Sequence, residues 1–421
     1  MAAPSAGSTV DQRARRLVVA LTTAAFLEWA GATAIVPLLP LFLRDRGASD
    51  SLVGLVMGAF FFAGVVTQYP LGKLSDRIGR RPVLIFGLVC YAAASVAFAA
   101  PVTPVVYVVL RAVQGVGAGA TLVVAAATLS ESLPPGRRGR GFGALFGGQT
   151  AGMAVGPLLG SLGGPDAMTP VFIGAGLAAL AACVPVLAQV PRRPLTERSA
   201  GDEHRLPLRQ LVTSRVVLGV MVATASIGVL TGTYEVCWGL LMSSRGASSW
   251  QIGLSWTLWS IPFVAVSVPA GKLADRLDRR WLTALALLAS AGFAASYPFV
   301  PTVSLLIALG AVEGLAVATS YPAPLSMLAD GVKPGELGRA QGMVSTAETA
   351  AVAVFASVSG VLFAISAWVA FVTAATAIVV AVAVLAVIWA PVQGRAMAAA
   401  SERSQIEAVE AEAASASTRR H

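Results

Sequence analysis

Charged residues, histidine and paired cysteines are scarce in this sequence. Charged residues make up only 12% of the 421 residues, about half the usual share in a soluble domain, whereas hydrophobic residues make up 56%. The two histidines, His204 and His421, lie outside every long apolar stretch, which excludes histidine-based proton chemistry inside a membrane. The three cysteines, Cys90, Cys183 and Cys237, show neither a CxxC motif nor a metal-ligand spacing, so they indicate neither a disulfide framework nor a metal site.

Long apolar runs dominate the rest of the chain, and the mean hydropathy is +0.76. Stretches close to the ~20 residues that a bilayer-spanning helix needs occur at about 17–43, 52–71, 82–100, 103–129, 142–163, 169–190, 216–242, 250–270, 281–299, 303–327, 340–363 and 367–390. Strand-like alternation is absent, so helices are the spanning structure that remains. The first stretch is too long for a signal-peptide core, which predicts a retained helix. We therefore predict an all-α membrane protein with twelve transmembrane helices.

The sequence repeats itself at a fixed displacement. Residues 72–84 (GKLSDRIGRRPVL) return as residues 271–283 (GKLADRLDRRWLT), 199 positions later. The same displacement relates residues 46–49 to residues 245–248. A repeat of this length predicts two pseudo-symmetric six-helix bundles.

Basic residues are distributed unevenly between the two ends of the predicted helices. Of the 30 Lys and Arg, only Arg44, Arg46 and Arg245 fall on one side, Arg111 lies inside a span, and the others fall on the opposite side. The positive-inside rule places that basic side in the cytoplasm. The predicted division is a cytoplasmic N-terminus (1–16), a first bundle (17–190), a cytoplasmic linker (191–215), a second bundle (216–390) and a cytoplasmic tail (391–421). The formal charge of +9 is therefore a topology signal and needs no nucleic acid to explain it.

The repeated loop resembles the signature of the major facilitator superfamily, and the resemblance covers roughly residues 17–390. The matching residues are Gly72, Asp76, Arg77, Gly79 and Arg80, with Asp275 and Arg279 in the second copy. The resemblance implies the major facilitator fold and a latch, in which Asp76 and Arg80 hold the cytoplasmic ends together when the protein faces outward. A loop whose arginines only fix the topology is the alternative. The second copy departs from the pattern, because it has Asp278 where the first has Gly79.

Two further motifs resemble those of proton-coupled members of this family. Arg111 lies in the fourth span before Gln114 and Gly115, and an arginine inside an apolar helix is retained only where a partner or water solvates it. The resemblance implies a part in proton handling; a buried structural ion pair is the alternative. The fifth span carries an element similar to that of the antiporters, in which small residues allow close helix packing and the proline provides a bend: Gly152, Gly156, Pro157 and Gly160.

Four acids occupy apolar helices: Glu28, Glu235, Glu313 and Glu348. In the family's fold, helices 1, 4, 7 and 10 line a central cavity, and the resemblance places Glu28, Arg111, Glu235 and Glu313 on those helices as proton-coupling residues. A carboxyl group in a low-dielectric cavity can hold a proton at neutral pH and release it when a cation approaches. We favour Glu235 and Glu28 over Glu313 as proton carriers.

Several side chains near these residues are candidates for the wall of the substrate cavity, where aromatic rings stack on a flat cation. They are Trp29, Gln114, Tyr234, Trp238, Tyr321 and Glu348. Plain packing, or an aromatic belt at the membrane surface, is the alternative for each ring. Glu348 is equally well explained as a structural partner on a supporting helix.

These features favour a secondary transporter over an enzyme. No nucleotide-binding loop and no nucleophile with a nearby base is present in the sequence, so we expect no cofactor and an ion gradient as the energy source. We expect a monomeric proton-coupled exporter of small amphipathic or cationic compounds such as drugs, in a bacterial plasma membrane, with protons, substrate and the lipid bilayer as its partners. The alternatives are a dedicated exporter of a metabolite, sugar or self-made antibiotic, and a non-transporting membrane receptor or assembly factor.

Overall fold

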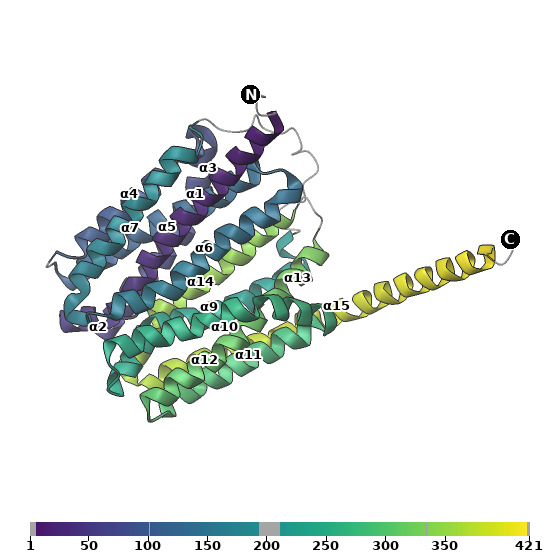
Figure 1. Cartoon of the computed structure of the whole chain (residues 1–421). Coiled ribbons are helices and arrows are strands. Elements are labelled where there is room, and N and C mark those ends of the chain that lie inside the picture. The colour runs from purple at the N-terminus through teal and green to yellow at the C-terminus, as the bar shows by residue number, and fades with distance from the viewer. Residues whose placement is uncertain (1–5, 101, 193–210, 333–335, 419–421) are drawn as a thin grey trace.

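The computed structural model describes residues 6–100, 102–192, 211–332 and 336–418, without the side chains of residues 6–11, 135–136, 263–276 and 393–418. Every regular element in this part of the chain is a helix. Twelve of the described helices have at least 18 residues, and Figure 1 shows them as two packed groups, one for each half of the chain. The predicted all-α fold of two six-helix bundles is therefore confirmed.

The first half contains the elements from the N-terminus to Gln189. They are α1 (Ala6–Ile35), α2 (Leu39–Asp45), α3 (Asp50–Ile78), α4 (Arg80–Ala97), α5 (Pro104–Ser132), α6 (Pro135–Ser161), the short 3₁₀ turn η1 (Pro165–Ala167) and α7 (Met168–Gln189).

The second half begins at Arg215, and the predicted linker falls mostly on residues 193–210, which lie outside the described chain. Its elements are α9 (Arg215–Ser244), α10 (Ser249–Arg276), α11 (Arg279–Ser296), the turn η3 (Tyr297–Phe299), α12 (Val303–Ser320), α13 (Pro322–Gly331), α14 (Leu337–Ile365) and α15 (Ala367–Thr418). α15 continues through the predicted tail and extends beyond the bundle (Figure 1).

Two of the predicted spans are interrupted at proline. The stretch 17–43 turns at residues 36–38, so that α1 ends at Ile35 and α2 begins at Leu39 with a proline in its first turn. The stretch 303–327 divides at Tyr321, and α13 begins at Pro322. Proline lacks the backbone N–H that would continue a helix but fits the first turn of a new one. Hydropathy alone does not register such breaks.

Ten of the described helical segments are long and apolar enough to cross a membrane. The two other long helices are α6 and α10. α6 begins with three arginines and is rich in glycine, both of which lower its hydropathy, and part of α10 lies outside the described side chains. α6 packs along α1 and α10 packs along α12, both of which are apolar spans, so length and position favour twelve spans in all.

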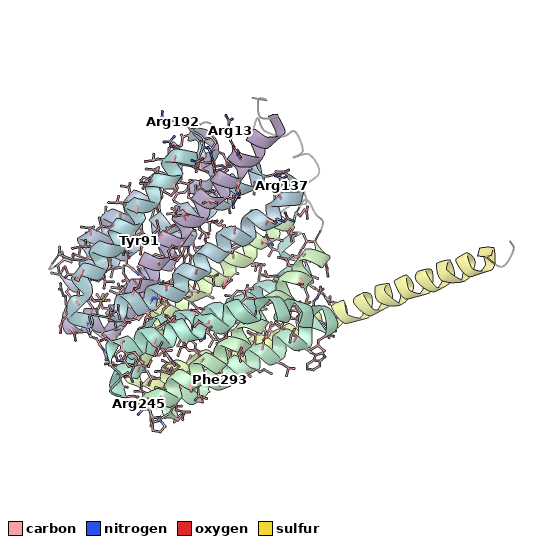
Figure 2. The ribbon with its side chains drawn as sticks, viewed as in Figure 1. Arg13, Tyr91, Arg137, Arg192, Arg245 and Phe293 are labelled. Atoms are coloured by element: carbon pink, nitrogen blue, oxygen red, sulfur yellow. The ribbon has the colours of Figure 1, made fainter. Side chains whose placement is uncertain are left out.

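Basic side chains gather at one end of the molecule. Figure 2 shows Arg13, Arg137 and Arg192 toward one end of the helices and Arg245 at the opposite end. This distribution is the one from which the sequence analysis derived its topology.

The two halves meet along α3 with α14 and along α6 with α10. A Cβ atom on Gly360 of α14 would lie 2.2 Å from the backbone oxygen of Asp50 at the start of α3, so only glycine allows this approach. Thr257 of α10 donates a hydrogen bond of 2.7 Å to the backbone oxygen of Ala154 on α6. Both contacts lie in the half of the molecule nearer the Arg245 end, which is therefore closed between the halves.

Candidate functional site

Arg111 of α5 is buried, with 2% of its surface exposed, and its side chain contacts Gln114 and Phe60. Its terminal nitrogen donates a 2.9 Å hydrogen bond to Oε1 of Gln114, whose Nε2 in turn donates a 2.9 Å hydrogen bond to Oγ of Ser95 on α4. The guanidinium carbon also lies 4.4 Å from the centre of the Phe60 ring on α3. The ring and the amide oxygen together solvate the charge and fix its orientation.

Nε of this arginine forms no hydrogen bond within the described chain, and the guanidinium interacts electrostatically with Tyr91 and with Glu235. Among the described side chains, Nε of Arg111 and Oε2 of Glu235 are buried without a hydrogen-bond partner. Glu235 lies on α9 of the second half, and the two opposite charges interact electrostatically although they are not in direct contact. Buried polar atoms in native structures are usually satisfied. Nine side-chain atoms in the described chain are not, and among them these two belong to groups of opposite charge in different halves.

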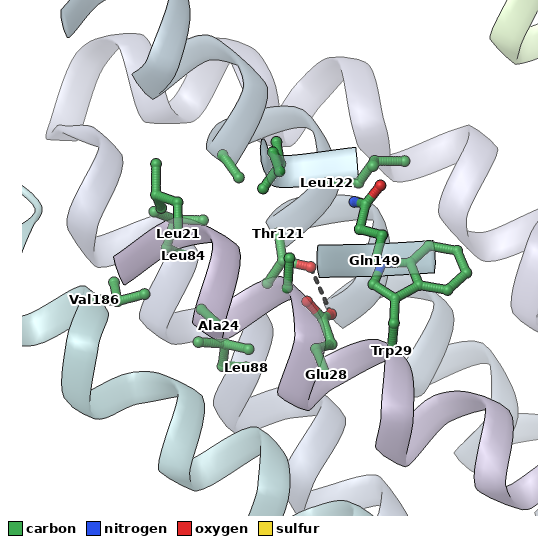
Figure 3. Close-up of a pocket in the computed structure, with 13 residues that line it drawn as sticks. Leu21, Ala24, Glu28, Trp29, Leu84, Leu88, Thr121, Leu122, Gln149 and Val186 are labelled. Carbon is green, nitrogen blue, oxygen red and sulfur yellow. Dashed lines mark hydrogen bonds between the residues drawn. The ribbon is translucent and has the colours of Figure 1, made fainter. Parts of the chain in front are cut away.

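Glu28 of α1 lies inside the first half, with 6% of its surface exposed. Thr121 of α5 donates a 2.6 Å hydrogen bond to its Oε1. A cavity of about 20 Å³ adjoins the carboxyl group, and Gln149 of α6 and Trp29 line it on one side (Figure 3). A space of this size and polarity accommodates about one water molecule. We call Glu28, Thr121 and Gln149 the N-half cluster.

Glu313 of α12 is enclosed in the second half, with 1% of its surface exposed. Tyr234 of α9 donates a 2.7 Å hydrogen bond to its Oε1, and Tyr297 of η3 donates a 2.6 Å hydrogen bond to its Oε2. The ring of Trp238 lies 4.9 Å from that of Tyr297, and its Nε1 donates a 2.8 Å hydrogen bond to Oγ of Ser255. The structure thus places Tyr234 and Trp238 in a packed aromatic group. We call Glu313, Tyr234 and Tyr297 the C-half cluster.

Glu348 of α14 is partly buried and accepts a hydrogen bond from the hydroxyl of Tyr321 at the junction of α12 and α13. A Cβ atom on Gly228 of α9 would lie 2.4 Å from the backbone oxygen of Glu348, so α9 and α14 are in close contact here. Glu348 therefore stands where three elements of the second half meet.

The structure separates residues that the sequence analysis had grouped around one cavity. Arg111 and Glu235 belong to different halves and interact electrostatically, while Glu28 and Glu313 lie inside opposite halves, each with hydroxyl partners of its own. Sequence reasoning missed Thr121, Gln149 and Tyr297. The repeat contained a signal for one of them, because Gln149 and Glu348 occupy equivalent positions 199 apart, as do Gln114 and Glu313.

The latch motif is paired within the first half. Arg80 contacts Asp76 at 2.6 Å and also pairs with Glu131 at the end of α5. Arg279 pairs with Asp330, and these two residues stand 199 positions after Arg80 and Glu131, so the second half repeats the arrangement. Gly72 of α3 faces Val123 of α5, and Arg77 is exposed. The Asp275 side chain lies outside the described residues.

The difference between Gly79 and Asp278 has a backbone explanation. Gly79 has a φ of +100°, which disfavours other residues, whereas Asp278 has a φ of −63° and caps α11 by accepting a 3.0 Å hydrogen bond from the backbone nitrogen of Arg280. Burial acts to raise the pKa of Asp278, but hydrogen bonds from the side chain and backbone of Arg280 outweigh it, and its pKa lies below the usual value.

The antiporter-like motif lies where α6 meets both α1 and α10. Cβ atoms on Gly152, Gly156 and Gly160 would lie within 2.7 Å of backbone oxygens of α1, so these glycines let the two helices approach. On its other side, the backbone oxygen of Pro157 lies 2.5 Å from where a Cβ atom of Gly253 on α10 would be. The motif therefore sits at a contact between the halves.

Comparisons with known proteins give a consistent result. A family model described as Major Facilitator Superfamily matches residues 21–236 and 216–420. The class G tetracycline resistance protein of Vibrio anguillarum is 32% identical over 354 residues, which cover 76% of this chain and 83% of that protein. The multidrug resistance protein MdtL of Klebsiella pneumoniae (strain 342) is 25% identical over 311 residues, which cover 72% and 79% of the two chains. A crystal structure of a mutant of the nucleoside transporter NupG has a TM-score of 0.74 at 15% identity and covers 89% of this chain and 100% of that one.

Proposed function

We propose that this chain, which belongs to the Major Facilitator Superfamily, is a proton-coupled exporter of small amphipathic or cationic compounds such as drugs, working by alternating access. It is a multi-pass membrane transporter of the drug-efflux type rather than an enzyme. Its similarity to tetracycline and multidrug resistance proteins supports the proposed substrate class. We place it in a bacterial plasma membrane with both termini in the cytoplasm, acting as a monomer with no cofactor beyond the proton gradient.

The observation that carries the proposal is the cross-half pair of Arg111 and Glu235. Each keeps a buried polar atom unsatisfied, and each belongs to a different half. At an effective dielectric constant near 20, the attraction of two unit charges falls from about 4 to about 2 kcal/mol when their separation doubles from about 4 to 8 Å. Rocking of the halves changes this separation, so the attraction depends on the conformation. Protonation of Glu235 removes it.

Proton binding at Glu235 is thereby linked to the position of the halves. An ionised Glu235 favours the conformation in which it lies nearer Arg111, and a protonated one does not. A cationic substrate and a proton compete for the carboxylate of Glu235. Because this carboxylate holds only one of them at a time, binding of the proton releases the substrate, and the two are exchanged. With the proposed topology, closure of the Arg245 end in this structure corresponds to a state closed to the outside.

The two clusters have subsidiary roles in this proposal. The N-half cluster supplies a second proton site, because Glu28 adjoins a space large enough for one water molecule and has a hydroxyl partner, Thr121. In the C-half cluster both carboxyl oxygens of Glu313 are engaged by tyrosines, which suits a positioning role. Trp29, Tyr321 and Glu348 are partly exposed and remain candidates for contact with substrate.

Inside-out membrane vesicles test the proposal. Wild-type vesicles should accumulate tetracycline or a cationic dye when their interior is acidified, and each exchanged proton supports about a tenfold accumulation per pH unit. The variant Glu235→Gln keeps the size of the side chain but cannot exchange a proton, so its accumulation ratio should fall to about 1. Asp45→Asn, at an exposed acid on α2, is the matched control and should behave as the wild type.

Two outcomes contradict this assignment. If Glu235→Gln accumulates the compound as strongly as the wild type, the cross-half pair takes no part in coupling. Absence of transport for every compound of a drug panel, with the protein correctly inserted, excludes the drug substrates and leaves a dedicated metabolite exporter.

A further inference from the structure

A groove lies on the surface of the first half between α1 and α7, apart from the polar clusters described above. Its volume is about 490 Å³. α7 contributes one wall with Pro185, Ala188 and Gln189, and α1 contributes the other with Gln12, Arg15, Arg16, Val19, Ala20 and Thr23. The α1 residues recur every three or four positions, which is the spacing of one helix face.

Polar and basic residues line one end of the groove on both walls. Gln12, Arg15 and Arg16 lie near the start of α1, and Gln189 is the last residue of α7, so polar and basic groups meet at one end. Beside them the lining is apolar, with Val19, Ala20, Pro185 and Ala188, and Thr23 lies at the far end of the α1 wall. From Arg15 to Thr23 the α1 wall extends about 12 Å along the helix axis. The groove thus combines a cationic mouth with a short apolar channel.

Within the described chain, no acidic side chain pairs with the positive charge at the mouth. Arg15 and Arg16 are exposed, and neither forms an ion pair or hydrogen bond with another residue in the part of the chain that the structure describes. Both lie at the basic end of the helices, which the topology proposed above assigns to the cytoplasm. The cytoplasmic leaflet carries anionic headgroups, and basic pockets between helices on this side suit them.

Small side chains make room for a chain of methylene groups. Ala20, Pro185 and Ala188 line the groove where larger aliphatic residues occur elsewhere on the lipid-facing surface, such as Leu177 and Val184 on α7. A groove of this shape takes an acyl chain lying along two helices, whereas a free phosphate ion would occupy only its mouth.

We propose that this groove binds one anionic phospholipid of the cytoplasmic leaflet, with the headgroup phosphate between Arg15 and Arg16 and the beginning of an acyl chain along Val19, Ala20 and Ala188. The inference uses the proposed membrane orientation but no part of the proton-coupling mechanism. Its test therefore measures lipid binding and not transport, and either proposal can fail alone.

Native mass spectrometry of the full-length protein in detergent measures the bound lipid directly. Phosphatidylglycerol should bind in a single saturable adduct and phosphatidylcholine should bind much more weakly. The double variant Arg15→Gln/Arg16→Gln should weaken phosphatidylglycerol binding by about 30-fold, which corresponds to about 1 kcal/mol for each basic residue. The matched control Arg13→Gln/Arg192→Gln removes the same charge from the same end of the molecule without touching the groove (Figure 2).

A third variant, Ala188→Phe, fills the channel and keeps both arginines. It should also lose the phosphatidylglycerol adduct, and millimolar inorganic phosphate should not displace that adduct from the wild type. Equal losses in the two double variants would show a diffuse surface charge and overturn the proposal. Equal binding of phosphatidylcholine and phosphatidylglycerol, or displacement by inorganic phosphate alone, overturns it as well.

Discussion

Replacing Tyr297 by phenylalanine tests how Glu313 is held in the second half. The change removes one hydroxyl and leaves the ring, which packs edge-on at 4.9 Å from Trp238 and at 6.3 Å from Phe371. Oε2 of Glu313 then loses its 2.6 Å hydrogen bond, while the bond from Tyr234 to Oε1 is untouched. Because Glu313 is only 1% exposed, water does not readily replace the lost donor.

The expected loss of stability depends on the charge of Glu313. A buried hydrogen bond to a charged group contributes about 1.5–3 kcal/mol, and one between neutral groups about 1 kcal/mol. For a unit the size of one half, about 1 kcal/mol corresponds to about 2–4 °C in the melting temperature. An ionised Glu313 therefore predicts a fall of roughly 6 °C, and a protonated one a fall of roughly 3 °C.

Thermal unfolding of the purified full-length protein in detergent measures this shift. Tyr69→Phe is the matched control, because Tyr69 is 72% exposed and its hydroxyl has no buried partner to lose. In a Glu313→Gln background, Tyr297→Phe should have a smaller effect, since the two residues then no longer share a charge-assisted bond. A melting temperature of Tyr297→Phe equal to that of Tyr69→Phe would refute the assignment of this hydrogen bond.

Three further predictions concern other parts of the molecule. Gly156→Ala should destabilise the protein by about 1–3 kcal/mol in the same unfolding assay, because its new methyl group would lie 2.4 Å from the backbone oxygen of Ala30. The control Gly143→Ala on the same helix places its methyl group in open space, so it should be neutral or stabilising. Arg111→Lys keeps the charge, but a lysine cannot both contact Gln114 and stack on Phe60. Gradient-driven accumulation in vesicles should therefore fall while insertion and expression stay normal. Unchanged transport would show that the orientation of the guanidinium is unimportant. The pKa of Asp278 is lowered in the folded protein, so its contribution to stability is present above the usual aspartate pKa and is lost as the pH falls through the lowered value. The difference in the free energy of unfolding between the wild type and Asp278→Asn should therefore shrink as the pH falls over that window. A difference that stays constant with pH contradicts this reasoning.

Composition and spacing alone were enough to predict the class of the protein and its internal symmetry. The long apolar runs predicted the membrane helices, and the 199-residue displacement predicted two equivalent bundles. The sequence also placed Glu28 and Glu313 within apolar runs, and both are buried, whereas it gave no sign of the buried Glu336. These properties follow from local composition and spacing, which do not depend on how the helices are rotated.

The partner of each buried polar group depends on how the helices pack against one another, which the sequence did not reveal. Lipid is as apolar as the protein interior, so a membrane helix shows no polar face from which its rotation can be deduced. Nothing in the runs around Glu28 and Glu313 therefore indicated that one would meet Thr121 and the other Tyr297. The unsatisfied atoms of Arg111 and Glu235 likewise became visible only once the two halves were packed together, because satisfaction of a hydrogen bond depends on contacts between helices that are distant in the chain.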